Sequence, residues 1–350
     1  MDTRYDPARE LLRRYQPDRA PWRSRARTAP AARAWQRRVR PRLVATLGFD
    51  TPLVPGRVRL LSCSDRGDHV REQYEMTTAL NVVMPFFLLR PAPGGKAPGS
   101  ARLPLIVACT GHGYGAREIV GLTQDGRERA IPDGYQSDFA VQLCRRGFIV
   151  AVPEIAGFGQ REHDFGSLAA RGSPVPTTCR YLSTLAWHHG GSVLGMRVRD
   201  LRRMLDHLLD SPQIDPGRAG IMGISGGGML ALFTSAIDTR LRATVVSGYF
   251  STFKDSILAM GHCWCNFVPG LGDFGEMHDL AALVAPRPLL VESGTQDVIF
   301  PITAVRAGLG KARRHYALHH ADAALAQHLF VGGHRIDGRK AMPFLQQHLA

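Results

Sequence analysis

The chain has 350 residues, of which 44% are apolar, together with 37 Gly and 23 Pro. This composition supplies ample material for a large buried core and excludes a disordered or fibrous protein. Because single α/β domains can reach roughly 250 residues, we expect one large domain with appendages.

The formal net charge is +14, and most of the excess lies in residues 1–42, where thirteen arginines accompany four acidic residues. A basic arm of this kind can bind nucleic acid or an anionic membrane. Here the arginines are interleaved with Trp22, Trp35 and Val39 and lead into Leu43 and Leu47, which favours a solvated helical flank. We therefore expect an N-terminal arginine-rich helical flank over residues 1–50, the main domain over residues 51–350, and neither a nucleic-acid partner nor a membrane.

Six cysteines are scattered along the chain, and none forms a C-x-x-C pair. This pattern predicts buried thiols in a reducing compartment rather than a zinc ribbon or a redox motif. No apolar run of signal-peptide length follows the N-terminal arginines, so we expect a cytoplasmic protein. Residues 219–237 carry no charge and could be mistaken for a membrane span. Their five glycines, and a spacing of apolar residues that changes along the stretch, indicate a strand, a turn and a helix instead.

Short β-branched runs alternate with longer amphipathic runs, which is typical of a mostly parallel sheet with helices on both faces. The expected strands, of which the first two are antiparallel, are Val58–Ser62, Thr77–Leu89, Leu105–Cys109, Phe148–Val152, Ala219–Met222, Ala243–Ser247, Pro288–Glu292 and Gln327–Val331. The expected helices are Gln136–Arg146, Met196–Leu209, Gly226–Ile237, Ile302–Lys311 and Met342–His348. The fold class is therefore predicted to be α/β.

Residues 223–227 read Gly-Ile-Ser-Gly-Gly and lie between an expected strand and an expected apolar helix. The G-x-S-x-G pattern in this context is typical of a nucleophile elbow, in which a serine stands on a very tight turn. Gly223 and Gly227 provide the small residues that such a turn needs on either side of Ser225. The backbone N–H of Gly226, at the start of the helix, would point to where an oxyanion forms.

A serine hydroxyl needs a base to activate it, and the base needs an acid to hold its tautomer. After a nucleophile elbow the acid comes next in the chain and the histidine last. Asp297 and His334 satisfy this order, and each follows an expected strand at its carboxyl end, where the sites of open α/β sheets assemble. As alternatives, Asp297 could simply help to start a helix, His334 could be an ordinary loop residue, and Asp255 is a reserve acid.

The loop after Leu105–Cys109 reads Thr-Gly-His-Gly-Tyr-Gly over residues 110–115. Its three glycines allow the backbone to approach a ligand closely, so His112 or Gly113 could supply a second oxyanion N–H. A purely structural glycine turn is the alternative.

Together these motifs resemble the α/β-hydrolase superfamily, in the branch similar to dienelactone hydrolases and bacterial acetyl xylan esterases. The segments that carry the resemblance are Trp35-Gln36-Arg37 with Leu47-Gly48, the Gly-His-Gly loop, Arg-Asp-Leu-Arg-Arg-Met-Leu-Asp from Arg199, the elbow, and Ala-Pro-Arg-Pro-Leu from Ala285. The dienelactone hydrolases have a cysteine where this chain has Ser225, so lactone cleavage is not implied.

The resemblance implies an α/β-hydrolase fold for residues 51–350 and hydrolysis of small-molecule carboxylic esters, acetyl esters among them. It also implies an acyl-enzyme formed by a Ser225, His334 and Asp297 triad, an oxyanion hole made by Gly226 and His112, and no need for a cofactor or metal. A peptidase or amidase on the same fold is one alternative, and a non-catalytic binding protein that retains the fold is another.

Two insertions, near residues 154–195 and 249–286, are expected to form walls of the substrate pocket. The second contains His262-Cys263-Trp264-Cys265, whose spacing does not match a metal-binding motif. Its apolar and aromatic neighbours favour a roof over the pocket instead.

Overall fold

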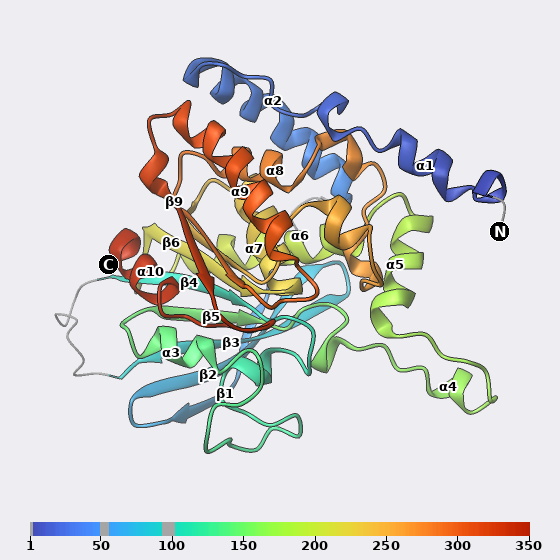
Figure 1. Ribbon diagram of the computed structural model, residues 1–350. Helices are drawn as coiled ribbons and strands as arrows, with labels where there is room; N and C mark the ends of the chain where they lie inside the picture. Colours follow the sequence, from blue (N-terminus) through green and yellow to red (C-terminus); the bar gives the residue numbers. More distant parts are fainter. Residues whose placement is uncertain (1–2, 50–55, 93–101) are drawn as a thin grey trace.

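The computed structural model describes residues 3–49, 56–92 and 102–350 (Figure 1). Within these ranges a single nine-stranded sheet has the strand order β1-β2-β3-β5-β4-β6-β7-β8-β9. The boundary that the sequence suggests at residue 50 lies outside the described residues.

The sheet is antiparallel on one side and parallel on the other. Its strands are β1 (Val58–Asp65), β2 (His69–Ala79), β3 (Val82–Pro91), β4 (Leu103–Cys109), β5 (Ile149–Pro153), β6 (Ile214–Ile224), β7 (Leu241–Ser247), β8 (Leu289–Gly294) and β9 (Leu325–Phe330). The pairs β1·β2, β2·β3 and β3·β5 are antiparallel, and all pairs from β5 through β4, β6, β7, β8 and β9 are parallel. This confirms the predicted α/β fold class.

The predicted strand Thr77–Leu89 is wrong, because the chain reverses within it. β2 ends at Ala79 and β3 begins at Val82, so Leu80 and Asn81 form the turn of a hairpin. Asn81 has φ of 57°, a left-handed conformation that asparagine tolerates better than most residues. Apolar residues on both sides of Asn81 concealed this turn, and one of them, Leu80, is 77% exposed despite its hydrophobic side chain.

The helices are α1 (Ala8–Arg14), α2 (Ala29–Leu47), α3 (Phe139–Cys144), α4 (Gly166–Ala169), α5 (Thr178–His188), α6 (Val193–Leu209), α7 (Gly226–Ile237), α8 (Met277–Val284), α9 (Ile302–Ala317) and α10 (Ala341–Leu349). The five expected helices correspond to α3, α6, α7, α9 and α10. No helix in the described ranges is long and apolar enough to cross a membrane. The uncharged stretch 219–237 is the end of β6 followed by α7, as predicted.

The two faces of the sheet are buried by different sets of helices. Along β4, Leu105 and Val107 point into one core while Ile106 and Ala108 point into the other. The first core is shared with α2, α6, α7, α8 and α9, and the second with α3 and α10 (Figure 1). Burial on both faces explains why the central parallel strands β4 and β5 are almost entirely apolar.

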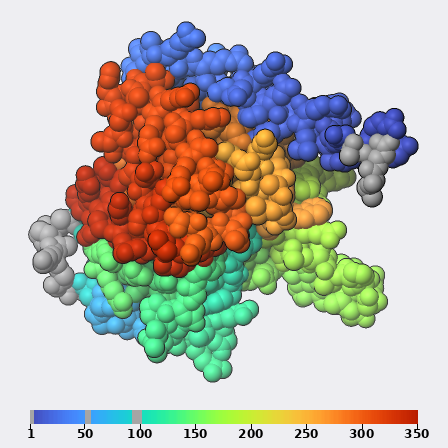
Figure 2. Space-filling model, in the orientation of Figure 1, coloured from blue at the N-terminus to red at the C-terminus, as the bar shows by residue number. Residues whose placement is uncertain are grey.

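The N-terminal flank packs on the main body along α2. Thr28 caps this helix through a hydrogen bond from the N–H of Ala31 (3.4 Å). The buried residues of α2 follow helical spacing and are Ala32, Trp35, Gln36, Val39, Leu43 and Leu47. The flank is therefore solvated on its arginine-bearing face and buried on the opposite face, and Figure 2 shows it lying against the C-terminal part of the chain.

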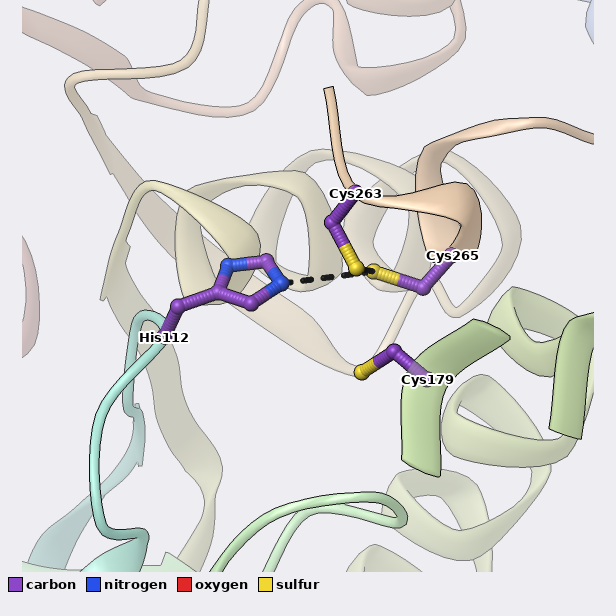
Figure 3. Close-up of side chains that lie close together, drawn as sticks. All are labelled: His112, Cys179, Cys263 and Cys265. Atoms are coloured by element: carbon purple, nitrogen blue, oxygen red, sulfur yellow. Dashed lines mark hydrogen bonds between the residues drawn. The ribbon is translucent and has the colours of Figure 1, made fainter. Parts of the chain in front are cut away.

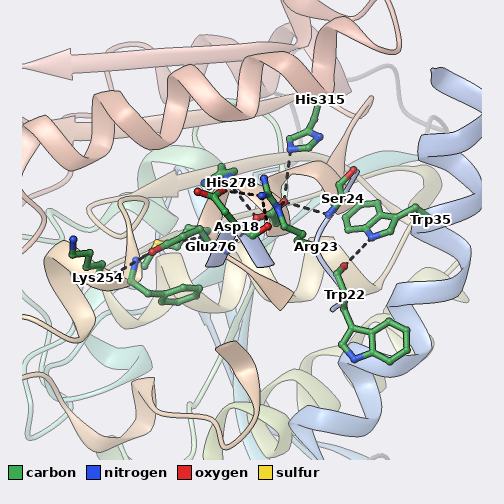
Figure 4. Close-up of polar contacts among 12 residues, drawn as sticks. Asp18, Trp22, Arg23, Ser24, Trp35, Lys254, Glu276, His278 and His315 are labelled. Atoms are coloured by element: carbon green, nitrogen blue, oxygen red, sulfur yellow. Dashed lines mark hydrogen bonds and ion pairs between the residues drawn. The ribbon is translucent and has the colours of Figure 1, made fainter. Parts of the chain in front are cut away.

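The segment just before α2 is held by polar contacts to the loop and helix around α8 (Figure 4). The N–H of Trp22 donates to the carbonyl of Asp273 (2.8 Å), and the indole of Trp35 donates to the carbonyl of Trp22 (2.8 Å). The amide of Gln36 donates to two carbonyls at the end of α8, those of Ala282 (2.7 Å) and Ala285 (2.6 Å).

Candidate active site

Ser225 stands at the turn between β6 and α7 in an unusual backbone conformation. Its φ is 55° and its ψ is −121°, and its N–H donates to the carbonyl of Ser247 at the end of β7 (3.0 Å). A side chain at Gly223 would collide with the backbone of Gly227, and one at Gly227 would collide with the backbone of Cys109. The glycines of the motif are therefore required by the closeness of the turn, which is the nucleophile-elbow geometry.

Asp297 and His334 are brought together by the loops after β8 and β9. The Nδ1 atom of His334 lies 2.7 Å from Oδ2 of Asp297, whose side chain is fully buried. The other oxygen, Oδ1, accepts hydrogen bonds from the N–H groups of Ile299 (2.8 Å) and Phe300 (3.2 Å). The carboxylate is thus fixed by its own loop and presents one oxygen to the imidazole, as an orienting acid should.

The His334 ring lies beside the serine turn. It stacks between Tyr135 and Phe300, with ring centroids 5.6 and 5.7 Å away. A methyl group at Gly248 would be only 3.0 Å from Cε1 of His334, and Gly248 directly follows the residue whose carbonyl holds the N–H of Ser225. Ser225, His334 and Asp297 therefore gather at one end of the parallel strands.

Asp255, the alternative to Asp297 as the acid that orients the histidine, makes only local contacts. Its carboxylate accepts a hydrogen bond from the hydroxyl of Thr252 (2.6 Å), and that hydroxyl in turn accepts one from the N–H of Asp255 (3.1 Å). Asp255 is exposed in this local turn, whereas Asp297 pairs with His334.

Glu292 is a buried acid at the end of β8 that the sequence analysis did not assign to the site. Its Oε1 accepts hydrogen bonds from the hydroxyl of Ser247 (2.9 Å) and the N–H of Asp337 (3.1 Å), and its Oε2 accepts one from the N–H of Gly338 (3.0 Å). These bonds tie the loop that carries His334 to β7 and β8. The sequence feature that could have indicated this role is a charged residue within an otherwise largely apolar strand.

The loop after β4 lies against the start of α7. The N–H of Gly111 donates to the side chain of Gln136 (2.8 Å), and the hydroxyl of Tyr135 donates to the carbonyl of His112 (2.6 Å). The His112 imidazole would be 3.2 Å from a methyl group at Gly226. The loop therefore reaches the helix end at which an oxyanion would be stabilised.

The two insertions contact each other next to this loop. Trp187 of α5 stacks on Trp264 with ring centroids 5.5 Å apart, and its indole donates to the carbonyl of Phe267 (3.1 Å). His262 packs near Phe300, which also contacts His334, and burial lowers the pKa of His262, with His112 and His334 adding to the effect. His262 is therefore a further side chain beside the site.

A family model matches residues 5–329, and its description is the Abhydrolase family. The chain belongs to the Abhydrolase family. YtaP of Bacillus subtilis strain 168, described as a candidate hydrolase, is 30% identical over 138 residues, covering 35% of this chain and 46% of YtaP. The alignment thus spans about half the length of that relative.

Solved structures of low identity share the fold across nearly the whole chain. A candidate acetyl xylan esterase of Bacteroides fragilis superposes with a TM-score of 0.78 and 16% identity, covering 99% of this chain and 95% of the other. A glucuronoyl esterase of Solibacter usitatus gives a TM-score of 0.65 and 17% identity, with 92% and 94% coverage. Acetyl xylan esterase 1 of Thermoanaerobacterium gives 0.59 and 17%, with 90% and 94% coverage. These likenesses confirm the predicted α/β-hydrolase fold.

Proposed function

We propose that this member of the Abhydrolase family hydrolyses carboxylic esters of small molecules through an acyl-enzyme. The observation that carries the proposal is the 2.7 Å contact between His334 and a buried carboxylate, beside a serine held on a strained turn. A serine, an imidazole and an orienting carboxylate at one sheet edge form the machinery of acyl transfer.

In the proposed reaction, the Oγ of Ser225 attacks the ester carbonyl carbon while Nε2 of His334 removes the hydroxyl proton. Asp297 holds the proton on Nδ1 and stabilises the imidazolium that forms. The tetrahedral oxyanion accepts hydrogen bonds from the N–H groups of Gly226 and His112. His334 then protonates the leaving alcohol, and a water molecule activated by the same imidazole releases the acid.

Acetyl esters of carbohydrates are the substrate class we propose. Two of the structural neighbours carry acetyl xylan esterase in their names.

The first test is the Ser225→Ala variant, assayed with a p-nitrophenyl acetate-type ester. Loss of the nucleophile should lower kcat by about a million-fold, because the members of such a triad act as a unit. The exposed Ser173 provides the control, and Ser173→Ala should keep wild-type turnover. Unchanged turnover in Ser225→Ala would contradict the proposal.

Two further measurements separate the alternatives. A fluorophosphonate probe should label the wild-type chain and spare Ser225→Ala, whereas a binding protein that only retains the fold would stay unlabelled. Paired esters and amides of the same acyl group should show cleavage of the ester alone, and comparable amide cleavage would indicate a peptidase or amidase.

A further inference from the structure

Four side chains from three distant parts of the chain converge next to the candidate active site (Figure 3). Cys263 and Cys265 come from the second insertion, Cys179 from α5 in the first insertion, and His112 from the loop after β4. Their ligand atoms, three Sγ atoms and one imidazole nitrogen, all lie within 4.8 Å of one another. Cys179 and Cys265 are buried, and His112 and Cys263 are half-buried.

The spacing of these atoms is close to that of a tetrahedral metal centre. With metal–sulfur bonds of about 2.3 Å, the ligands of such a centre lie roughly 3.5 to 4 Å apart. The Nε2 atom of His112 lies 3.6 Å from Sγ of Cys265, and the sulfur atoms of Cys263 and Cys265 lie 3.3 Å apart. The four donors thus need only small shifts to surround one ion.

A buried arginine beside the cluster supplies an independent indication of negative charge there. Arg197 is 1% exposed and lies 3.3 Å from Sγ of Cys179. Its guanidinium also contacts the carbonyl of Ala156 (3.0 and 2.7 Å) and the ring of Phe158 (4.7 Å), and its Nη1 is buried without a hydrogen-bond partner. No carboxylate among the described residues forms an ion pair with this guanidinium, and thiolates of the cluster would supply the counter-charge that a buried arginine favours.

Three thiolates and a neutral imidazole around a divalent ion leave one net negative charge, which the guanidinium of Arg197 would neutralise.

We infer that His112, Cys179, Cys263 and Cys265 form a binding site for a thiophilic divalent cation, with zinc as the expected ion. Thiolate and imidazole donors in a tetrahedral set are typical of zinc. Since the chain supplies all four ligands, the site has no open coordination position and is structural. Zinc would join the two insertions to the loop that carries the proposed oxyanion donor.

The binding mode also determines the tautomer of His112. Coordination through Nε2 places the ring proton on Nδ1, and the Nδ1 side of the ring faces Gly226 at the start of α7. The metal would thus fix the position of the loop and the orientation of a donor next to the oxyanion site. This inference concerns a site separate from the proposed nucleophile, so each can fail without the other.

The sequence gives no indication of this site. The pair Cys263 and Cys265 has one residue between its members, and the other two ligands lie far away in the chain. The expectation of no metal rested on that local spacing, whereas the convergence depends on how α5 and the second insertion pack together.

The test is metal analysis of the full chain, purified without a histidine tag or chelator and under reducing conditions. Inductively coupled plasma mass spectrometry should find one zinc ion per chain. Cys265→Ser, Cys179→Ser and the half-buried Cys263→Ser should each lose most of it. Cys144→Ser is the matched control, because Cys144 is a buried thiol of α3 in the other core and should keep the full zinc content.

Cobalt substitution provides a readout that does not depend on mutant folding. The wild-type chain loaded with Co²⁺ should show the visible bands of tetrahedral cobalt together with thiolate-to-cobalt charge transfer in the near ultraviolet. Removing zinc with a chelator should also lower the Tm of the wild type and of Cys144→Ser, because binding energy at a structural site contributes to folding.

Three results would overturn the inference. The first is zinc at no more than trace levels in the wild-type chain, and the second is an octahedral cobalt spectrum without charge transfer. The third is a disulfide between Cys263 and Cys265 in the native chain, seen as a mass lower by two hydrogens, because it would consume two of the four ligands. Fluorophosphonate labelling of Ser225 in the metal-free chain reports separately on the proposed hydrolase.

Discussion

At the scale of single residues, strain and burial are concentrated at the candidate site. Ser225 occupies a positive-φ conformation that costs of the order of 1–3 kcal/mol for a residue with a side chain. The turn is held by the bond from its N–H to Ser247 and by glycines that allow close approach. Asp297 is likewise buried, and both of its carboxylate oxygens have partners. One accepts a hydrogen bond from its own loop, and the other contacts His334.

The Asp297→Asn variant tests the role of this carboxylate. Asparagine can keep the bonds from Ile299 and Phe300, but its amide nitrogen would face Nδ1 of His334 and favour the wrong tautomer. We expect kcat for ester cleavage to fall by about ten-thousand-fold with little change in thermal stability. Asp255→Asn should keep wild-type activity, and an equal loss in both variants would argue against the assignment of Asp297.

The three candidate triad residues could be named from the sequence because each follows an apolar strand and their order is constrained by the fold. The structure places His334 against Asp297, and the catalytic roles stay a prediction. Glu292, Tyr135 and His262 could not be predicted in this way. Their roles depend on contacts with Gly338, His334 and Phe300, which lie in other loops and which no local pattern connects.

At the scale of elements, the parallel half of the sheet was the most predictable part, since each of its strands contains a short, largely apolar stretch. The hairpin between β2 and β3 was missed because Leu80 continues the apolar run through the turn. α8 was missed because its N-cap is Glu276 rather than the Ser, Thr, Asp or Asn that typically marks a helix start. Its capping box pairs Glu276 with Asp279 and is visible in the structure.

The packing of helix α2 against the main domain should contribute measurably to the free energy of unfolding of the whole protein. Trp35 is 7% exposed in the core, and its indole donates to the carbonyl of Trp22. Trp35→Ala should lower the free energy of unfolding by about 3–5 kcal/mol, from lost packing and a lost hydrogen bond. Denaturant titration would measure this change.

Arg37 offers a control on the exposed face of the same helix. Arg37→Ala should change the free energy of unfolding by no more than about 0.5 kcal/mol. If Trp35→Ala proved equally mild, the flank would contribute little to folding and would be better described as a detachable arm.

At the scale of the whole molecule, stability should depend on pH through a buried acid that lies outside the triad. Glu154 is 1% exposed, and its Oε1 accepts a hydrogen bond from the N–H of Ala116 (2.9 Å) while its Oε2 has no partner. Burial raises the pKa of Glu154 to about 7, although the N–H of Ala116 and the nearby Arg161 and Arg117 act in the opposite direction.

A raised pKa means that the folded protein binds this proton more tightly than the unfolded chain. The resulting stability is fully present below the ordinary glutamate pKa and is lost as pH rises through about 7. Relative to Glu154→Gln, the free energy of unfolding of the wild type should therefore fall by about 3 kcal/mol between acidic and mildly alkaline pH. Chemical denaturation of both chains across this range would measure the difference, and parallel curves would contradict the assignment.

The contacts of Tyr135 have a consequence for redesign. Its ring lies against His334, the proposed general base, and its hydroxyl donates to the carbonyl of His112, whose N–H is the proposed oxyanion donor. Proton relay and charge stabilisation thus share one phenol, so an exchange at this position would alter both halves of the chemistry together. Attempts to broaden the range of acyl groups should therefore leave this phenol intact.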